Sequence, residues 1–191
     1  MKNYITDAEF VNEDYTKTEL ERGEYENCTF ENCNFAGSNL AEVIFVECTF
    51  DNCDFSNAKL LNTSFRETQF DTCKMLGLHF DECNPFLIAF HFTSCTLNFS
   101  SFYKLKLKGS RFSHCNLEEV DFTETDLSLA NFTECDFNGA TFDRSILEGT
   151  DFRTSFNFII DPENNRIKKA KFTRSTLAGL LRKYQIQIDN L

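Results

Sequence analysis

A large apolar residue recurs at every fifth position through most of the chain, and the residues between are mainly small or polar. This spacing matches neither the period of two of a strand nor the period of 3.6 of a helix. Phe112, Phe132 and Phe152 stand twenty residues apart, so four five-residue units make one longer repeat. The pattern predicts a solenoid whose coils each have four sides of five residues.

The twenty-residue period predicts a column of phenylalanine rings in the core. The register shifts by two residues after Phe80, which we interpret as a two-residue bulge at Pro85, because proline cannot donate to a strand ladder. Allowing this bulge, the core column consists of Phe10, Phe30, Phe50, Phe70, Phe92, Phe112, Phe132, Phe152 and Phe172. A second inward column would hold Tyr25, Phe45, Phe65, Leu87, Leu107, Leu127, Leu147 and Ile167. Coils at the usual strand separation of about 4.8 Å would allow the rings to stack with an offset.

The chain has nine cysteines, and eight of them fall two residues before a large apolar residue. Free cysteine behaves as a small hydrophobe, so we predict that these thiols pack in the core. Neighbours in a column would be close enough for disulfides, and only a reducing compartment argues against them. No CxxC pair or nearby pair of histidines suggests zinc, so we predict no metal and no cofactor. His79, His91 and His114 are scattered and no nucleophile stands beside a base, which predicts that the chain is not an enzyme.

Segments such as 115–122 (CNLEEVDF) and 130–137 (ANFTECDF) resemble the pentapeptide-repeat family, whose pattern is small, polar, Leu or Phe, any, any. The resemblance covers roughly residues 10–177. It implies an all-β solenoid, a right-handed quadrilateral β-helix of about eight coils with a short C-terminal helix. We therefore divide the chain into a β-helix over residues 1–173 and a C-terminal helix and tail over residues 174–191.

The C-terminal segment has apolar residues at helical spacing, so we expect a helix followed by a short strand in which Ile186 and Ile188 alternate with polar residues. The apolar face of this segment either caps its own last coil or pairs with a second copy. The resemblance implies pairing, because gyrase-protecting members of the family dimerise through this end. The predicted dimer interface consists of Leu177, Leu180, Leu181, Tyr184, Ile186 and Ile188.

The formal net charge of −11 makes nucleic-acid binding improbable. No apolar stretch is long enough to span a bilayer and no signal peptide opens the chain, so we expect no membrane partner and a cytoplasmic location. Acidic residues gather between residues 118 and 151, where they are either a solvated surface or a phosphate-like surface for a DNA-binding partner. These candidate partner-binding residues are Glu118, Glu119, Asp121, Glu124, Asp126, Glu134, Asp136, Asp143, Glu148 and Asp151. Glu31, Asp51 and Asp71 form a further outward column.

The segments 73–77 (CKMLG), 101–103 (SFY) and 160–167 (IDPENNRI) resemble the branch that includes the albicidin-resistance and microcin-immunity proteins, relatives of the Qnr quinolone-resistance proteins. This resemblance implies a non-catalytic protein that imitates DNA, binds DNA gyrase or topoisomerase IV, and protects against a gyrase-directed toxin or antibiotic. Qnr proteins carry sizeable loops on the coil, whereas this pattern predicts only a two-residue bulge. The alternative is an interaction scaffold with another partner.

Overall fold

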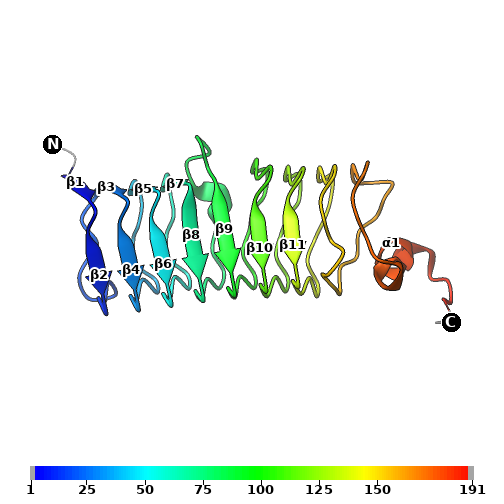
Figure 1. Cartoon of the computed structure of the whole chain (residues 1–191), viewed down its shortest axis with the longest axis horizontal. Coiled ribbons are helices and arrows are strands. Elements are labelled where there is room, and N and C mark those ends of the chain that lie inside the picture. The colour runs from blue at the N-terminus through cyan, green and yellow to red at the C-terminus, as the bar shows by residue number, and fades with distance from the viewer. Residues whose placement is uncertain (1–2, 189–191) are drawn as a thin grey trace.

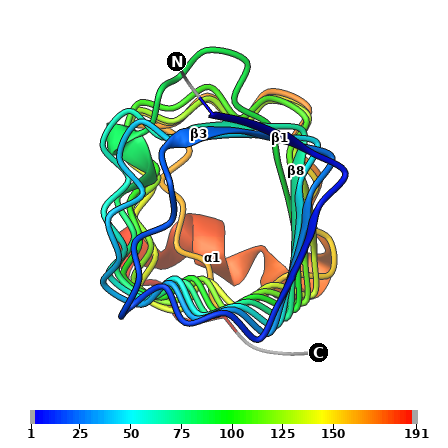
Figure 2. The same ribbon diagram turned by 90° about the vertical axis from the view of Figure 1, so that its left-hand side faces the viewer.

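The computed structural model describes residues 3–188, which wind into a four-sided solenoid of stacked coils (Figures 1 and 2). Seen along its axis, the solenoid is nearly square (Figure 2), and the N-terminal coil and the C-terminal helix lie at opposite ends (Figure 1). We number the four sides in chain order. In one coil, the inward residues of sides 1 to 4 are Phe112, Leu117, Phe122 and Leu127, and all four are fully buried.

Two parallel sheets run along the rod. On side 1, the sheet contains β2 (Glu9–Val11), β4 (Thr29–Glu31), β6 (Thr49–Asp51), β8 (Thr68–Asp71), β9 (Phe90–Thr93), β10 (Arg111–Ser113) and β11 (Asn131–Thr133). On side 4, a shorter sheet contains β1 (Asn3–Thr6), β3 (Gly23–Glu26), β5 (Ile44–Val46) and β7 (Ser64–Arg66). Because β1 pairs with β3, residues 3–6 continue the coil and do not cap its open end. Elsewhere on the rod, neighbouring coils are joined by isolated parallel β-bridges.

The phenylalanine column of side 1 is continuous, as the sequence predicts. Rings in consecutive coils stack with centroids 4.6 to 5.4 Å apart, from Phe10 on Phe30 to Phe152 on Phe172. The rings at the two ends of the column are partly exposed, and the seven between them are buried. Burial of each such ring contributes roughly 1.5–3 kcal/mol, so the column is a main source of the rod's stability.

The small inward residues also bond one coil to the next. Thr125 Oγ1 donates to the carbonyl oxygen of Phe102, 23 residues earlier, over 2.8 Å, and Cys53 Sγ lies 3.4 Å from the carbonyl oxygen of Phe30 in the same relation. All nine cysteines are free and buried, as expected for packing residues. Their burial raises the pKa of Cys33 to about 11 and that of Cys48 to about 12, which keeps them as thiols at neutral pH.

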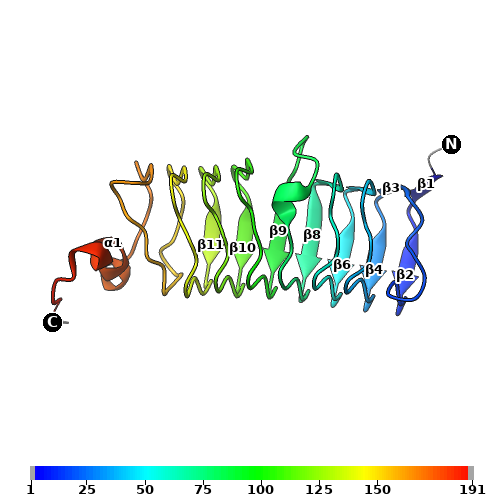
Figure 3. The ribbon, with the colours of Figure 1, turned by 180° about the vertical axis from the view of Figure 1, so that it is seen from behind.

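The coil that contains Pro85 departs from the prediction. The coil keeps the register of the preceding coils as far as Asn84, whose backbone N–H donates to the carbonyl oxygen of Thr63. After η1 (Phe80–Glu82) and Cys83, the chain leaves the wall at Pro85 and projects as a loop before it rejoins in β9 (Figures 1 and 3). Leu87, predicted in the core, is 65% exposed on this loop, and the buried Phe90 contacts the Phe65 ring in its place.

The C-terminal segment forms three short turns of helix: η2 (Arg174–Thr176), α1 (Ala178–Leu181) and η3 (Arg182–Tyr184). The backbone of α1 packs directly on the last coil, because the carbonyl oxygen of Gly179 accepts a hydrogen bond from the N–H of Ile160. The strand expected at Ile186 and Ile188 is absent, since no neighbouring strand pairs with this stretch. Residues 189–191 of the predicted tail lie outside the described residues. No helix within residues 3–188 has the length and apolarity required to cross a membrane.

Candidate partner-binding surfaces

The acidic residues predicted from positions 118 to 151 lie on all four sides of the rod. Each side of a coil is only five residues long and has few outward positions. Carboxylates that are close together in the sequence therefore lie on different sides of the rod. Side 1 carries Glu134 and Asp151, side 2 Glu118, Glu119 and Asp136, side 3 Asp121, Glu124 and Asp143, and side 4 Asp126 and Glu148. No single side gathers this group.

Half of these carboxylates have a basic neighbour. Glu124 lies 3.1 Å from Arg144 and 3.6 Å from Lys104, and Asp143 shares Arg144. Asp151 is bound by Arg153, whose hydrogen bonds lower the pKa of this carboxyl below its ordinary value, and also lies near Lys171.

Glu148 pairs with Arg166 at 2.7 Å, and Glu134 lies 3.1 Å from the imidazole of His114. Ion pairs therefore offset only part of the negative charge of this acidic segment.

Other acidic residues have a structural role at the corners. The side chains of Asp121, Asp126 and Asp136 each accept a hydrogen bond from the backbone N–H two residues later, at 2.8 to 3.0 Å. This is the Asx turn, which aspartate and asparagine favour equally. Much of the aspartate in the repeat thus follows from turn geometry and not from a need for charge.

The excess of negative charge lies in the first half of the chain. Residues 1–100 contain 17 Asp and Glu against 6 Lys and Arg, whereas residues 101–191 contain 13 of each. The net charge of −11 therefore belongs entirely to the N-terminal half of the rod. The sequence pattern indicates both the later segment, whose carboxylates are closely spaced with few bases between them, and the outward column Glu31, Asp51 and Asp71 in the N-terminal half.

Side 1 of this N-terminal half carries a straight row of acidic residues. Glu31, Asp51 and Asp71 are in register on β4, β6 and β8, and all three side chains are exposed. We call these three residues the carboxylate column. None of them forms an ion pair within residues 3–188. Neighbouring strands are about 4.8 Å apart, so the three residues follow one another at this interval along the rod. Like charges at this distance repel, so a cationic partner would relieve them.

The predicted dimer-interface residues are only partly used within the chain. Leu180 packs against the core of the last coil, and Leu181 is half-buried. The remaining four residues, Leu177, Tyr184, Ile186 and Ile188, are 42 to 55% exposed. A groove of about 480 Å³ runs beside Leu181, Ile186 and Ile188. The segment therefore caps its own coil with one leucine and leaves the rest of the apolar face uncovered.

The described part of the chain holds no cluster of three or more His, Cys, Asp or Glu side chains placed to bind a metal ion. The three histidines lie on different coils, and the buried thiols face backbone carbonyl oxygens. The two surfaces with the clearest physical signature are thus the carboxylate column and the C-terminal apolar face.

A family model described as a pentapeptide repeat region matches residues 23–90 and 79–152 of the sequence, which together make up more than half of the chain. The chain belongs to the pentapeptide-repeat family. This membership explains the coil geometry, since one five-residue unit forms one side of the solenoid. No curated protein sequence matches this pentapeptide-repeat protein.

Comparison with solved structures finds several that are similar to this chain. A trypsin-treated form of QnrB1, a plasmid-mediated fluoroquinolone resistance protein, is 20% identical, with 98% of this chain and 100% of that chain covered and a TM-score of 0.47. HetL, involved in heterocyst differentiation regulation in the cyanobacterium Nostoc, is 16% identical, with 87% and 84% covered and a TM-score of 0.40. A protein from the thylakoid lumen of Arabidopsis thaliana is 18% identical, with 65% and 64% covered and a TM-score of 0.26.

Proposed function

We propose that this pentapeptide-repeat protein is a non-catalytic ligand of DNA gyrase, or of topoisomerase IV, that occupies a DNA-binding surface and protects the enzyme from a toxin or antibiotic. The observation that carries the proposal is the carboxylate column, a straight row of unpaired charges on a flat parallel sheet. A surface that binds DNA is rich in Lys and Arg, so such a row would be attracted to it as a phosphate backbone is. The resemblance of segments 73–77, 101–103 and 160–167 to the albicidin-resistance branch supports the choice of gyrase.

The test is a supercoiling assay with purified gyrase, with and without a gyrase poison. We expect inhibition of supercoiling at high protein concentration and relief of poisoning at lower concentration. A triple variant, Glu31→Gln with Asp51→Asn and Asp71→Asn, should lose most of both effects. Its matched control removes three charges from the later segment through Glu118→Gln, Glu119→Gln and Asp121→Asn.

The control also tests the later acidic segment, which remains a candidate surface. If the control variant loses the effect and the column variant keeps it, recognition uses residues 118–151. If the unaltered protein has no effect on gyrase with or without poison, the gyrase proposal fails. A pull-down that recovers a different partner would then favour an interaction scaffold of another kind.

We further propose that two copies pair through the C-terminal apolar face. Four exposed apolar side chains at one end of an acidic rod support this proposal, because exposed apolar groups gather where proteins associate. Leu181→Glu should convert dimers to monomers in size exclusion with light scattering. Leu61→Glu, at an exposed leucine far from this end, is the control and should leave the mass unchanged. A monomeric unaltered protein at micromolar concentration would end this proposal.

A further inference from the structure

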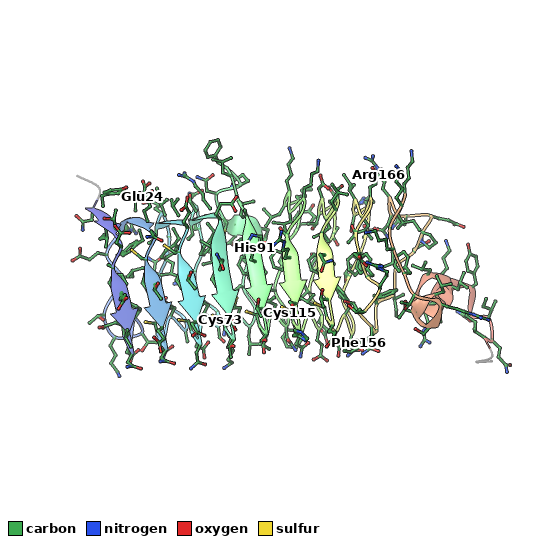
Figure 4. The ribbon with its side chains drawn as sticks, in the orientation of Figure 1. Glu24, Cys73, His91, Cys115, Phe156 and Arg166 are labelled. Atoms are coloured by element: carbon green, nitrogen blue, oxygen red, sulfur yellow. The ribbon has the colours of Figure 1, made fainter. Side chains whose placement is uncertain are left out.

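Side 4 carries a groove in the C-terminal half of the rod. The groove has a volume of about 340 Å³ and is lined by Lys108, Leu129, Glu148, Gly149, Lys168 and Lys169. These residues belong to four successive coils, so the groove runs along the rod axis. Glu24 and Arg166 mark the N-terminal and C-terminal parts of this side along the upper edge of the molecule (Figure 4).

The groove is basic, although the protein is acidic. Lys108, Lys168 and Lys169 are exposed, and within the described residues none of them has an ion-pair partner. The one carboxylate in the lining, Glu148, already binds Arg166 at 2.7 Å. Basic residues elsewhere, such as Lys104 and Arg144, are paired with carboxylates. Three of the seven Lys and Arg residues between 101 and 188 without an ion pair in this structure therefore line the groove, and the other four are Lys106, Arg111, Arg174 and Arg182.

An exposed leucine lies in the middle of the groove. Leu129 is 62% exposed and its φ is +59°, a conformation unfavourable for a large side chain. The equivalent corners of the neighbouring coils are Gly109 and Gly149. The Leu129 side chain leans over the next coil, since a Cβ on Gly149 would lie only 2.8 Å from Leu129 Cδ2. The positive φ is shared by corner residues throughout the rod, so the exposure of this large apolar side chain is what points to a contact outside the fold.

We propose that this groove binds an extended acidic peptide segment of a partner protein, with acidic residues on both sides of an apolar one. Lys108 and the pair Lys168 and Lys169 are three coils apart, about 14 Å at strand spacing. Acidic residues four positions apart in an extended peptide are separated by about 13 Å, so they reach both ends while the apolar residue between them covers Leu129. A nucleic acid would match the lysines but not the central leucine. The groove lies on a different side from the carboxylate column, so this proposal does not depend on gyrase binding.

The experiment measures fluorescence anisotropy of a fluorescein-labelled peptide of sequence EEALAEE at low salt. We expect saturable binding that weakens with added salt, and at least tenfold weaker binding of the peptides EEASAEE and SSALASS. The double variant Lys108→Gln with Lys168→Gln should weaken binding of EEALAEE at least tenfold. The control pair Lys59→Gln with Lys106→Gln removes the same charge outside the lining and should change the affinity less than twofold.

Leu129→Gly separates a binding role from a structural one. Glycine relieves the positive φ, so the thermal midpoint should rise while the affinity for EEALAEE falls severalfold. The proposal is overturned if EEALAEE does not bind, if the control pair weakens binding as much as the groove pair, or if Leu129→Gly leaves the affinity unchanged. It is also overturned if an oligothymidylate of seven nucleotides binds as tightly as EEALAEE, because the site would then be a general polyanion surface.

Discussion

The ring of Phe112 lies 4.7 Å from that of Phe132, with an angle of 20° between their planes. The ring of Phe92 stacks on the other face of Phe112 at 5.0 Å. Phe112 is thus enclosed by the coils above and below it, and the rigid walls on four sides prevent neighbouring side chains from filling the space it occupies.

Truncation of this ring should strongly destabilise the rod. We expect Phe112→Ala to lower the free energy of unfolding by about 3–5 kcal/mol, because the cavity cannot collapse. Denaturant unfolding followed by circular dichroism measures the change. Phe86→Ala is the control, since Phe86 is 61% exposed on the projecting loop, and it should lower the free energy of unfolding by less than about 1 kcal/mol. Equal unfolding midpoints for the two variants would contradict the stacked core.

The buried hydroxyl of Thr125 should contribute through its hydrogen bond to Phe102. Thr125→Val keeps the shape of the side chain but removes the donor, so we expect a loss of about 0.5–1.5 kcal/mol in the free energy of unfolding. Thr125→Ser keeps the hydroxyl and loses a methyl group, and so separates the hydrogen bond from packing. If the valine variant is as stable as the unaltered protein, coil-to-coil hydrogen bonds from this position contribute little.

Gly179 should be essential for docking of the C-terminal helix. A Cβ at this position would lie 2.3 Å from the carbonyl oxygen of Phe158, a backbone atom that cannot move aside easily. In Gly179→Ala we expect faster hydrogen exchange in residues 174–184 and little change in the coils. Gly109→Ala is the control, because open space surrounds Gly109 and only its positive φ opposes a side chain. Unchanged exchange in the Gly179 variant would show that the helix docks without this close contact.

The contact between Lys183 and the turn at Asp161 should weaken in acid. Lys183 Nζ binds Asp161 at 2.6 Å and Glu163 at 2.7 Å, and these hydrogen bonds lower the pKa of both carboxyls and raise the pKa of the ammonium. Because the folded carboxyls have lowered pKa values, their contribution is complete above the ordinary pKa of about 4 and is lost as the pH falls through the lowered values.

Peptide-resolved protection of residues 174–184 should therefore decrease on acidification below about pH 4, relative to the coils. The variant Lys183→Met removes the cation, and its protection should depend much less on pH over this range. Protection that falls equally in both proteins would assign the effect to other carboxylates.

The repeat made most of the fold predictable, because each inward position serves one local purpose. A phenylalanine every twenty residues on side 1 can only stack if the coils are in register, so the column from Phe10 to Phe172 could be predicted without coordinates. The inward residue of the irregular coil on side 4 could not be predicted in this way. Leu87 and Phe90 are both apolar, and which one enters the core depends on where the chain leaves the wall after Pro85.

The surfaces were less predictable than the core. Asp126, before the inward Leu127, closes an Asx turn, whereas Asp51, after the inward Phe50, stands free, and the residue type alone does not distinguish the two roles. Ion pairs such as that of Glu148 with Arg166 join residues almost one coil apart, so the local sequence does not reveal that the charge is neutralised. The acidity of the N-terminal half, by contrast, follows from a count of charges along the sequence.

The contacts of Thr125 with Phe102 and of Phe112 with Phe132 have a further consequence. Both join residues about twenty positions apart, and neither requires a residue from a distant part of the chain. Gain or loss of one twenty-residue block would leave every remaining layer with suitable neighbours above and below it. Molecular length can therefore evolve by duplication or deletion of such blocks, independently of the cross-section, and the separation between the acidic end and the helical end changes in equal increments.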